Sequence, residues 1–359
     1  MHIDGRMLYS SGIGRCLREI LAEIVSIDKD LVIYLYCSLP DYRKYLDEYS
    51  INTGRLYYRK YESRIYSFRE QITGSFLNLK IRKSDIFYFP HYNLPFVVHK
   101  NSIITVHDFI QFKFTEYFGN FKVRVAKLIL NNAARKARKI ILVSKSTYND
   151  FCEYFPGYED KALVIYNGIS EKFKTLREEE KENFYRKTGL DKYLLFIGNN
   201  KPHKNISGLI NSYVEIKERF PEYKLVIISR GFEKERMPGG ITVIDDVPDD
   251  ELVYYYNCAS MLVMPSFYEG FGLPAAEAMA CGCPVIASNI SSLPEICGEA
   301  GILIDPYNKS SLTEAIGRLI TDKNLKQTLV DRGIGRAKLF NWRISAQKYL
   351  EVFKNITGE

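Results

Sequence analysis

The sequence predicts an α/β protein made of two separate domains, each built on its own parallel sheet. The chain has 359 residues, which is enough for two domains of roughly 150 to 200 residues. Short runs of β-branched and aromatic residues alternate with helical stretches along its whole length, as is typical of βαβ units. Near the middle, a charge-rich run with few apolar positions, residues 172–187, interrupts this alternation.

The predicted elements follow one another in regular order. Strands are expected in the first half over residues 2–6, 31–36, 56–60, 85–88, 102–106, 140–143 and 163–165. In the second half they are expected over residues 193–198, 224–229, 241–244, 261–265, 284–287 and 302–304. The intervening helices include one that ends near Ile27, one over 121–139, and an amphipathic helix over 342–356.

The charge-rich run sets the domain boundaries. We expect an N-terminal domain over residues 1–170, an exposed linker over 171–192 and a C-terminal domain over 193–340. The last segment, residues 341–359, is expected to cross back to the N-terminal domain as a helix.

Composition excludes several classes of protein. With 46% hydrophobic, 26% charged and 14% aromatic residues, the chain is neither disordered nor fibrous. No apolar run reaches the roughly 18 residues of a membrane span, and nothing at Met1 resembles a signal peptide, so a cytoplasmic protein is expected. The seven cysteines are scattered and odd in number, which favours reduced thiols over a disulfide framework.

The net charge of +7 lies entirely in the first half of the chain. Residues 1–170 hold 25 Lys or Arg against 17 Asp or Glu, a net charge of +8, whereas the remaining residues hold 25 against 26. This asymmetry indicates an anionic partner for the first half, such as nucleic acid, an acidic membrane surface or a phosphorylated substrate. An ordinary basic surface is the alternative.

The first candidate site is the segment 10–15, which follows the first strand and contains Gly12 and Gly14. Glycines at a strand-to-helix turn let the backbone approach a ligand, and a helix N-terminus favours a phosphate. A dinucleotide fingerprint would need a third glycine where Leu17 stands, so an NAD enzyme is disfavoured. A tight turn without a ligand is the alternative.

The second candidate is the pair His107 and Asp108 at the carboxyl end of a buried-looking strand, where open α/β sheets place their ligands. An imidazole there could polarise a substrate hydroxyl, or it could be a hydrogen-bonded structural histidine. The other histidines lack metal-ligand spacing, and the pair Cys281 and Cys283 has no second pair nearby, so we predict no metal site.

The third candidate is the polar segment 198–205, which leaves a strand and opens a helix. Lys201 and Lys204 lie within four residues at this helix start, where they would repel each other and oppose the helix dipole unless an anion binds. The segment therefore predicts a phosphate site, with a solvated loop as the alternative.

The fourth and most specific candidate is the segment 265–287. Glu269 lies in a glycine-rich loop after a strand, and Glu277 lies in the first turns of the helix entered through Pro274. Carboxylates so placed can accept hydrogen bonds from two sets of sugar hydroxyls, while glycine N–H groups between them face a diphosphate. Glu277 stands among apolar residues, and its burial requires either a polar ligand or an internal donor.

Taken together, these motifs resemble those of the retaining glycosyltransferases of family 4, bacterial surface-polysaccharide type, over nearly the whole chain. Glu269 and Glu277 match the E-x7-E signature of that family. The other matching pieces are Asp4-Gly5-Arg6, Gly12-Ile13-Gly14-Arg15, His107-Asp108, Val143-Ser144, Tyr166-Asn167-Gly168, Lys204-Asn205 and Cys281-Gly282-Cys283-Pro284-Val285. The resemblance implies a GT-B architecture, in which two Rossmann-like domains with parallel sheets face each other across a cleft.

The resemblance also implies roles for individual residues. Glu277 would bind the ribose of a nucleotide, Glu269 the donor sugar, and Lys204 the diphosphate leaving group. His107 would lie beside the donor sugar on the acceptor side, with Asp108 next to it. The remaining donor contacts are implied for Gly12, Gly14, Gly270, Phe271, Gly272, Leu273 and, near the base, Val247.

One departure from the family concerns the residue after Gly198. Many members have Arg there, and this chain has Asn199. A second cation at the diphosphate must then come from Lys201 or Arg230, or be absent.

The resemblance implies a retaining hexosyl transfer from a nucleotide sugar to a glycan or lipid-linked acceptor in surface polysaccharide synthesis, such as lipopolysaccharide O-antigen. No metal and no cofactor are expected, because lysines, helix N-termini and backbone donors can stabilise the departing diphosphate. GDP-mannose is the preferred donor, ahead of UDP-sugars and dTDP-rhamnose. The first half would meet the anionic inner face of the cell membrane peripherally.

Three alternatives remain at this stage. The first is a nucleotide-sugar epimerase or hydrolase of the same architecture, and the second a non-catalytic nucleotide-sugar-binding protein. Nucleic-acid binding is disfavoured, because the basic helix over 121–139 and the aromatic and basic cluster within residues 57–69 lack any recognised binding module.

Overall fold

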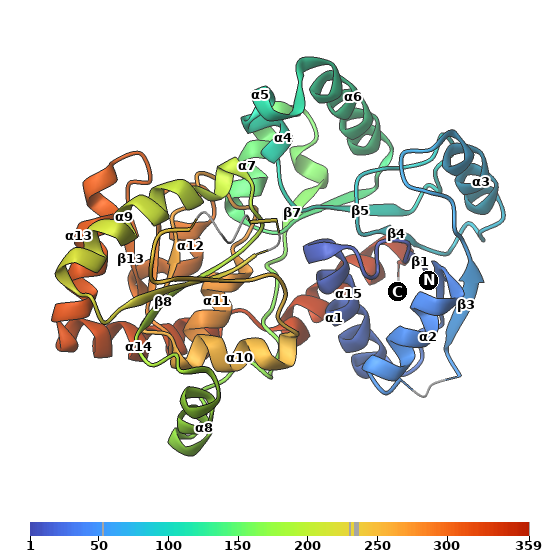
Figure 1. Ribbon diagram of the computed structural model, residues 1–359. Helices are drawn as coiled ribbons and strands as arrows, with labels where there is room; N and C mark the ends of the chain where they lie inside the picture. The colour runs from blue at the N-terminus through green and yellow to red at the C-terminus, as the bar shows by residue number, and fades with distance from the viewer. Residues whose placement is uncertain (52–53, 230, 233–236, 359) are drawn as a thin grey trace. The chain divides into compact units, whose positions relative to one another are not determined.

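The computed structural model describes residues 1–51, 54–229, 231–232 and 237–358, and the chain divides into two compact units. The first unit consists of residues 1–168 and 342–359, and the second of residues 169–341 (Figure 1). Residues 171–192, expected as a linker, lie within the second unit. Among the described residues, no helix is both long enough and apolar enough to cross a membrane.

The first unit is a seven-stranded parallel sheet of order β3-β2-β1-β4-β5-β6-β7. Its strands are β1 (His2–Asp4), β2 (Ile33–Cys37), β3 (Leu56–Lys60), β4 (Phe87–Phe89), β5 (Ser102–Val106), β6 (Lys139–Leu142) and β7 (Ala162–Val164). Its helices are α1 (Ser11–Ile27), α2 (Leu39–Glu48), α3 (Phe68–Leu79), α4 (Ile110–Lys113), α5 (Thr115–Phe118), α6 (Asn120–Lys136), α7 (Lys145–Tyr154), α15 (Trp342–Thr357) and the 3-10 turn Glu159–Lys161.

The second unit is a six-stranded parallel sheet of order β10-β9-β8-β11-β12-β13. Its strands are β8 (Tyr193–Ile197), β9 (Lys224–Ile228), β10 (Ile241–Ile244), β11 (Met261–Met264), β12 (Val285–Ser288) and β13 (Gly301–Ile304). Its helices are α8 (Glu178–Thr188), α9 (Ile206–Arg219), α10 (Asp249–Cys258), α11 (Leu273–Ala280), α12 (Leu293–Cys297), α13 (Lys309–Thr321), α14 (Lys323–Ala337) and the 3-10 turns Pro202–Lys204 and Gly298–Ala300.

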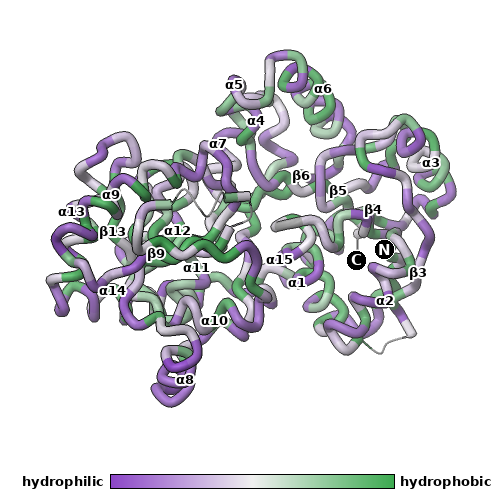
Figure 2. The backbone as a smooth tube through the Cα atoms, in the orientation of Figure 1, coloured by the Kyte–Doolittle hydropathy of each residue, from purple (hydrophilic) through white to green (hydrophobic). Residues whose placement is uncertain are grey.

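All thirteen predicted strands are present, each within two residues of its expected limits. Strands of a parallel sheet are covered on both faces, so nearly all their residues are apolar. This is why continuous apolar runs in the sequence identify them. Figure 2 shows this contrast in the second unit, where β9 is hydrophobic and α8 is hydrophilic. The exception in α8 is the buried Phe184, whose ring stacks on Tyr254 of α10.

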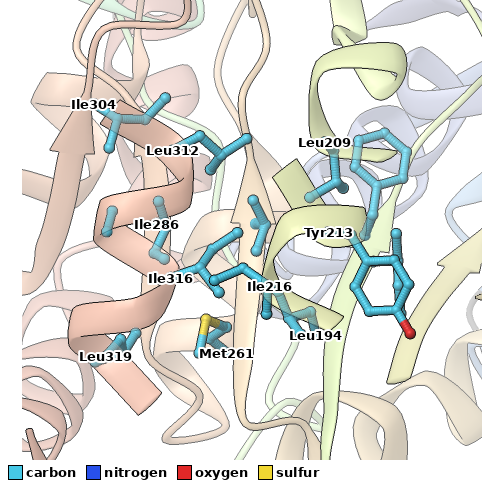
Figure 3. Close-up of a cluster of buried hydrophobic side chains, with 14 of the residues drawn as sticks. Leu194, Leu209, Tyr213, Ile216, Met261, Ile286, Ile304, Leu312, Ile316 and Leu319 are labelled. Carbon is cyan, nitrogen blue, oxygen red and sulfur yellow. The ribbon is translucent and has the colours of Figure 1, made fainter. Parts of the chain in front are cut away.

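The core of the second unit joins the sheet to α9 and α13. Ile216 of α9 and Ile316 of α13 are completely buried against Leu194, Met261 and Ile286 of the strands (Figure 3). Each such side chain contributes about 1.5–3 kcal/mol by leaving water. This packing fixes the sheet, so the loops at the carboxyl ends of its strands start from rigid positions.

Helix α15 belongs to the first unit, where it packs along α1. The hydroxyl of Ser345 donates to the carbonyl of Tyr166 at 2.6 Å, and the backbone of Trp342 leaves no room for a side chain at Gly168. The helix also reaches the sheet, because Tyr349 bonds the hydroxyl of Thr105 in β5 at 3.2 Å.

Helix α6 differs from its predicted form. It spans Asn120–Lys136, so Arg138 and Lys139 lie beyond it. Its buried residues are Leu130, Ala133 and Ala134, in the second half of the helix. Val125, in the first half of the helix, is more than one third exposed although it is apolar, and Phe121 and Leu128 are more exposed still.

Candidate functional site

In the second sheet, the strand order reverses between β8 and β11. Ligands of open parallel sheets bind beyond the carboxyl ends of the strands at such a reversal. Two predicted segments leave the sheet at this point, residues 198–205 after β8 and residues 265–272 after β11. The fold therefore brings the lysine segment and the glycine-rich segment to one edge.

An ion pair joins these two segments. The ammonium of Lys204 donates to both carboxylate oxygens of Glu269, at 2.7 and 2.8 Å, and Ser266 donates to Oε1 at 2.7 Å. The Lys204 and Glu269 side chains are only 13% and 10% exposed. An ammonium has three donors and a carboxylate about four acceptor positions, so each group retains capacity for a ligand beyond the partners that the structure describes.

Two residues beside this pair have left-handed backbone. Asn205 begins α9 with a φ of 52°, and Ser291 has a φ of 56°. The hydroxyl of Ser291 accepts a hydrogen bond from the backbone N–H of Glu269 at 2.9 Å, and Ser292 donates to the carbonyl of Glu269 at 3.0 Å. This conformation is uncommon for serine, and such backbone concentrates at functional sites, where surrounding contacts hold it.

The glycine-rich loop depends on Gly272, which precedes α11 with a φ of 99°. A Cβ at this position would lie 2.8 Å from Cδ2 of Leu293. The loop also packs through Phe271, whose ring meets that of Phe340 edge-on. Gly272 has no side chain and the first turn of α11 has no acidic residue, so neither opposes an anion at this helix start; the N–H groups of Ala275 and Ala276 bond the carbonyl of Gly272.

Glu277 is only 2% exposed, and the structure supplies the internal donor that its burial requires. The hydroxyl of Tyr256 in α10 donates to Oε2 of Glu277 at 2.8 Å. Tyr256 is itself buried and held by an edge-on contact with Phe173. The carboxylate is thus oriented from the side of α10.

The other predicted donor-binding residues of this unit lie around the pair. Asn199 and Lys201 are exposed in the loop after β8, and Lys201 forms no ion pair with the described residues. Val247 is half-buried in the loop after β10, and Leu273 is the first residue of α11. Arg230, the other candidate for a second cation at the diphosphate, lies outside the described residues.

In the first unit, His107 follows β5 and bonds the neighbouring loop. Its Nε2 lies 2.9 Å from the carbonyl oxygen of Pro90. A carbonyl only accepts, so Nε2 carries the hydrogen and Nδ1 is left as an acceptor. Burial lowers the pKa of His107 to about 4, against the opposing effect of the Pro90 bond, so the ring is neutral at pH 7. Asp108 is exposed and accepts from the N–H of Ile110 at 3.2 Å.

A buried ionic network lies at the strand reversal of this first sheet, between β1 and β4. Arg6 pairs with Asp4 at 2.5 Å and with Glu70 of α3 at 2.6 Å, and its guanidinium lies over the ring of Tyr61. Asn93 donates to both oxygens of Glu70. Burial alone would lower the pKa of Arg6, but the Asp4 carboxylate raises it, so the guanidinium stays charged.

Gly12 and Gly14 are not in a loop. Helix α1 begins at Ser11, so both glycines lie in its first turn. A Cβ at Gly14 would lie 2.5 Å from the carbonyl oxygen of Met7, whereas a Cβ at Gly12 would meet nothing within 4 Å. Gly14 is therefore required by packing, and only Gly12 faces open space.

Sequence reasoning missed the residues that hold the predicted ones in place. Tyr256, Ser291 and Glu70 all reach their partners from other elements. Only Ser266 could have been found from the local sequence, since it lies three residues before Glu269 and its hydroxyl can reach that carboxylate within the same loop. Within the described ranges, no group of three or more His, Cys, Asp and Glu is arranged to hold a metal.

Two family models cover most of the chain. Residues 10–173 match the model described as Glycosyltransferase Family 4, and residues 177–336 match the model described as Glycosyl transferases group 1. The O-antigen chain mannosyltransferase B of Escherichia coli is 31% identical over 293 residues, which cover 77% of this chain and 76% of that protein. The chain belongs to the family 4 glycosyltransferases.

This glycosyltransferase is also similar to a longer protein, the serotype-specific mannosyltransferase WbdA of Escherichia coli. The two are 26% identical over 278 residues, and the match spans 71% of this chain and 33% of WbdA.

Solved structures show the same fold. The sucrose-phosphate synthase of Thermosynechococcus elongatus superposes with a TM-score of 0.78 at 16% identity, covering 99% of this chain and 98% of that one. WaaG, a glycosyltransferase involved in lipopolysaccharide biosynthesis, superposes with a TM-score of 0.77 at 13% identity and covers 98% and 99%. The glycosyltransferase thus has the GT-B fold, with two Rossmann-like parallel-sheet units.

Proposed function

We propose that this glycosyltransferase moves mannose from GDP-mannose, with retention of anomeric configuration and without a metal, onto a glycan or lipid-linked acceptor in surface polysaccharide synthesis. The observation that carries the proposal is the ion pair of Lys204 and Glu269 at the strand reversal of the second unit. The names of two relatives in Escherichia coli, an O-antigen chain mannosyltransferase and a serotype-specific mannosyltransferase, support the sugar, and the first of them supports the pathway.

The leaving group of such a transfer is a nucleoside diphosphate, which gains negative charge as the sugar departs. Lys204 is positioned for this charge by its two bonds to Glu269, and the positive end of the α11 dipole, with no acidic residue in its first turn, adds to the same effect. Preorganised donors in a water-poor site stabilise developing charge without reorganising during the reaction. Stabilisation by the chain itself supports the metal-free proposal.

Glu269 and Glu277 have different tasks in this proposal. Glu269 keeps acceptor capacity beside Lys204 and receives hydroxyls of the sugar. Glu277, fixed by Tyr256, receives the ribose hydroxyls. Neither carboxylate serves as a covalent nucleophile, so the acceptor attacks on the face that the diphosphate leaves.

The first unit supplies the acceptor side. A neutral His107 with an available Nδ1 accepts a hydrogen bond from a sugar hydroxyl and does not donate a proton at pH 7. The excess of basic residues in the first half supports peripheral contact with an anionic membrane that carries the acceptor. Cosedimentation with anionic and neutral liposomes at low and high salt tests this contact, and equal binding in all four conditions would remove it.

The donor is tested by a thermal-shift screen of GDP-, UDP- and dTDP-sugars, because a ligand that binds the native state raises its stability. GDP-mannose is expected to give the largest shift. A larger shift with a UDP- or dTDP-sugar would replace it as the donor.

Transfer is then measured with radiolabelled GDP-mannose. Lys204→Ala and Glu277→Ala are each expected to lower transfer by about tenfold or more while the protein stays folded. Unchanged turnover in either variant would contradict the assigned site. Incubation with donor alone distinguishes the alternatives: rapid consumption without acceptor indicates an epimerase or hydrolase, and tight binding without turnover indicates a non-catalytic binding protein.

A further inference from the structure

Two helices of the first unit expose stripes of large apolar side chains. On α3 the stripe is Phe68, Ile72, Phe76 and Leu79, with Phe68 73% exposed. On α6 it is Phe121, Val125 and Leu128, with Phe121 79% and Leu128 71% exposed. Spacings of three and four residues place each set on one helix face. Single exposed apolar residues are normal, but contiguous patches of them mark a surface that binds a ligand, a membrane or another protein.

A groove of about 730 Å³ lies between these two helices. Its apolar lining comes from both helices and from the loop after β4, and includes Leu94, Phe96, Phe121, Val125, Ala126 and Ile129. This volume lies within the range of sites that bind small organic ligands.

The loop between the helices is tied to both of them. Ser75 of α3 accepts from the N–H of Val97 at 2.9 Å, and Lys136 of α6 donates to the carbonyl of Phe96 at 2.8 Å. These bonds satisfy backbone groups of the loop, and Phe96 remains mostly exposed. The groove is therefore built into the unit by hydrogen bonds on both sides.

The charges on α6 beside the groove are of one sign, while the carboxylate of Asp108 lies near the polar end of the groove, at Tyr66 and Tyr92. Helix α6 carries five cations and no carboxylate between Asn120 and Lys136, and Lys122 is the charged residue of the groove lining. Glu70 on α3 is buried in the pair with Arg6. A hydrocarbon chain with an anionic head therefore complements the groove in both polarity and charge.

The polar part of the lining leads toward the acceptor side. Tyr92 and Gln111 line the groove, and Gln111 donates to the hydroxyl of Tyr92. The ring of Tyr92 stacks on His91, with 4.3 Å between the ring centroids. Burial lowers the pKa of His91 to about 4, and the neighbouring imidazole of His107 lowers it further.

We propose that the groove between α3 and α6 binds the hydrocarbon chain of the lipid that carries the acceptor, with Lys122 facing its phosphate. This proposal rests on the proposed function, because that function includes a lipid-linked acceptor with such a chain. It adds a binding site in the first unit to the donor site of the second.

Dodecyl phosphate below its micellar concentration is the probe, measured by isothermal titration calorimetry. The unmodified protein is expected to bind it, and Ala126→Trp, which fills the groove, to weaken binding about tenfold, or about 1.4 kcal/mol. Leu128→Ser is the matched control, since Leu128 lies on the same helix outside the groove lining. Equal binding to Ala126→Trp and the unmodified protein would overturn the proposal, as would equal binding of inorganic phosphate.

The charge is tested separately. Lys122→Glu is expected to weaken the binding of dodecyl phosphate and to leave the binding of neutral dodecyl maltoside unchanged. Lys127→Glu, outside the lining, is expected to leave the binding of both unchanged. Equal losses with Lys122→Glu and Lys127→Glu would refute a role for Lys122. If Ala126→Trp does not fold, Val125→Asp replaces it.

Two further measurements separate this proposal from others. A dimer in sedimentation that Ala126→Trp dissociates would show that a second copy covers the groove, and would overturn the proposal. Transfer to a chain-free acceptor is expected to be unaffected by Ala126→Trp. Groove-dependent binding without any transfer would leave the groove intact and refute the proposed function.

Discussion

The ion pair of Lys204 and Glu269 makes a prediction about stability as well as activity. Lys204→Ala would leave the Glu269 carboxylate, 10% exposed, with the hydroxyl of Ser266 as its remaining described side-chain donor. Breaking a buried pair from one side costs about 3–5 kcal/mol, and we expect about 3 kcal/mol because Ser266 still donates. For a unit of roughly 170 residues, this corresponds to a fall in Tm of about 6–12 °C. A native free energy of about 5–15 kcal/mol keeps the variant folded at 25 °C.

The assay is a double-mutant cycle measured by thermal unfolding and by transfer at 25 °C. Lys204→Ala and Glu269→Ala are each expected to lower Tm. The fall in Tm of the double variant is expected to be smaller than the sum of the two single falls, because it leaves no buried charge without its partner. Lys201→Ala is the matched control, since this exposed lysine lies three residues earlier and forms no ion pair that the structure describes. Equal Tm for Lys204→Ala and Lys201→Ala, or additive losses in the double variant, would refute the reasoning.

Three further predictions concern residues around the two sites. Tyr256→Phe removes the hydroxyl that donates a hydrogen bond to Glu277, so it is expected to lower the free energy of unfolding by about 1–3 kcal/mol. It is also expected to raise KM for the nucleotide sugar more than it lowers kcat, which steady-state kinetics at varied nucleotide-sugar concentration would show. Gly272→Ala is expected to destabilise by about 1–3 kcal/mol in urea titrations, because of its positive φ and the close approach of Leu293 in α12, whereas Gly12→Ala is nearly neutral; similar values for the two would contradict this. His107 has its pKa lowered from 6.5 to about 4 by burial, so the unfolded chain binds the extra proton, and this residue lowers the free energy of unfolding by up to about 3 kcal/mol as pH decreases from 6.5 to 4. His91 and His203 act in the same direction, so His107→Gln reduces the slope of the profile without removing it, and a profile identical to that of the unmodified protein would disprove the contribution of His107.

The strands and the placement of the main candidate residues could be predicted from the sequence because both are local properties. A buried parallel strand is an uninterrupted apolar run, and its carboxyl end is a polar break, so Lys204 and Glu269 could be assigned to strand ends by pattern alone. That they meet in an ion pair depends on β8 and β11 being neighbours. Strand order is set by packing over many residues, and a single sequence does not display it.

The partners of buried charges could not be predicted for the same reason. Glu277 clearly needed a donor, but Tyr256 comes from the preceding helix, 21 residues earlier. Glu70 pairs with Arg6 across 64 residues, and nothing near Glu70 marks it as completely buried. Burial of a charged residue is decided by tertiary contacts, since the same residue in a helix of identical local pattern would face solvent.

The exposed stripes of α3 and α6 show where hydrophobic periodicity misleads. The rule that the apolar face of a helix packs on the core predicts Val125 buried, and the second half of α6 follows it through Leu130 and Ala133. Phe121 and Leu128 are mostly exposed, so the same helix presents apolar residues to the outside. A purely structural helix would carry polar residues there, because exposed phenylalanine gives no stability and favours aggregation. The cations of α6 and the absence of carboxylates from that helix argue further that the apolar residues of the groove lining, Phe121 and Val125, meet an anionic amphiphile, since a basic surface without a partner would gain from mixed charges. The charge asymmetry of the sequence and the apolar stripes are therefore two properties of one surface, and neither explains the other unless a lipid binds there.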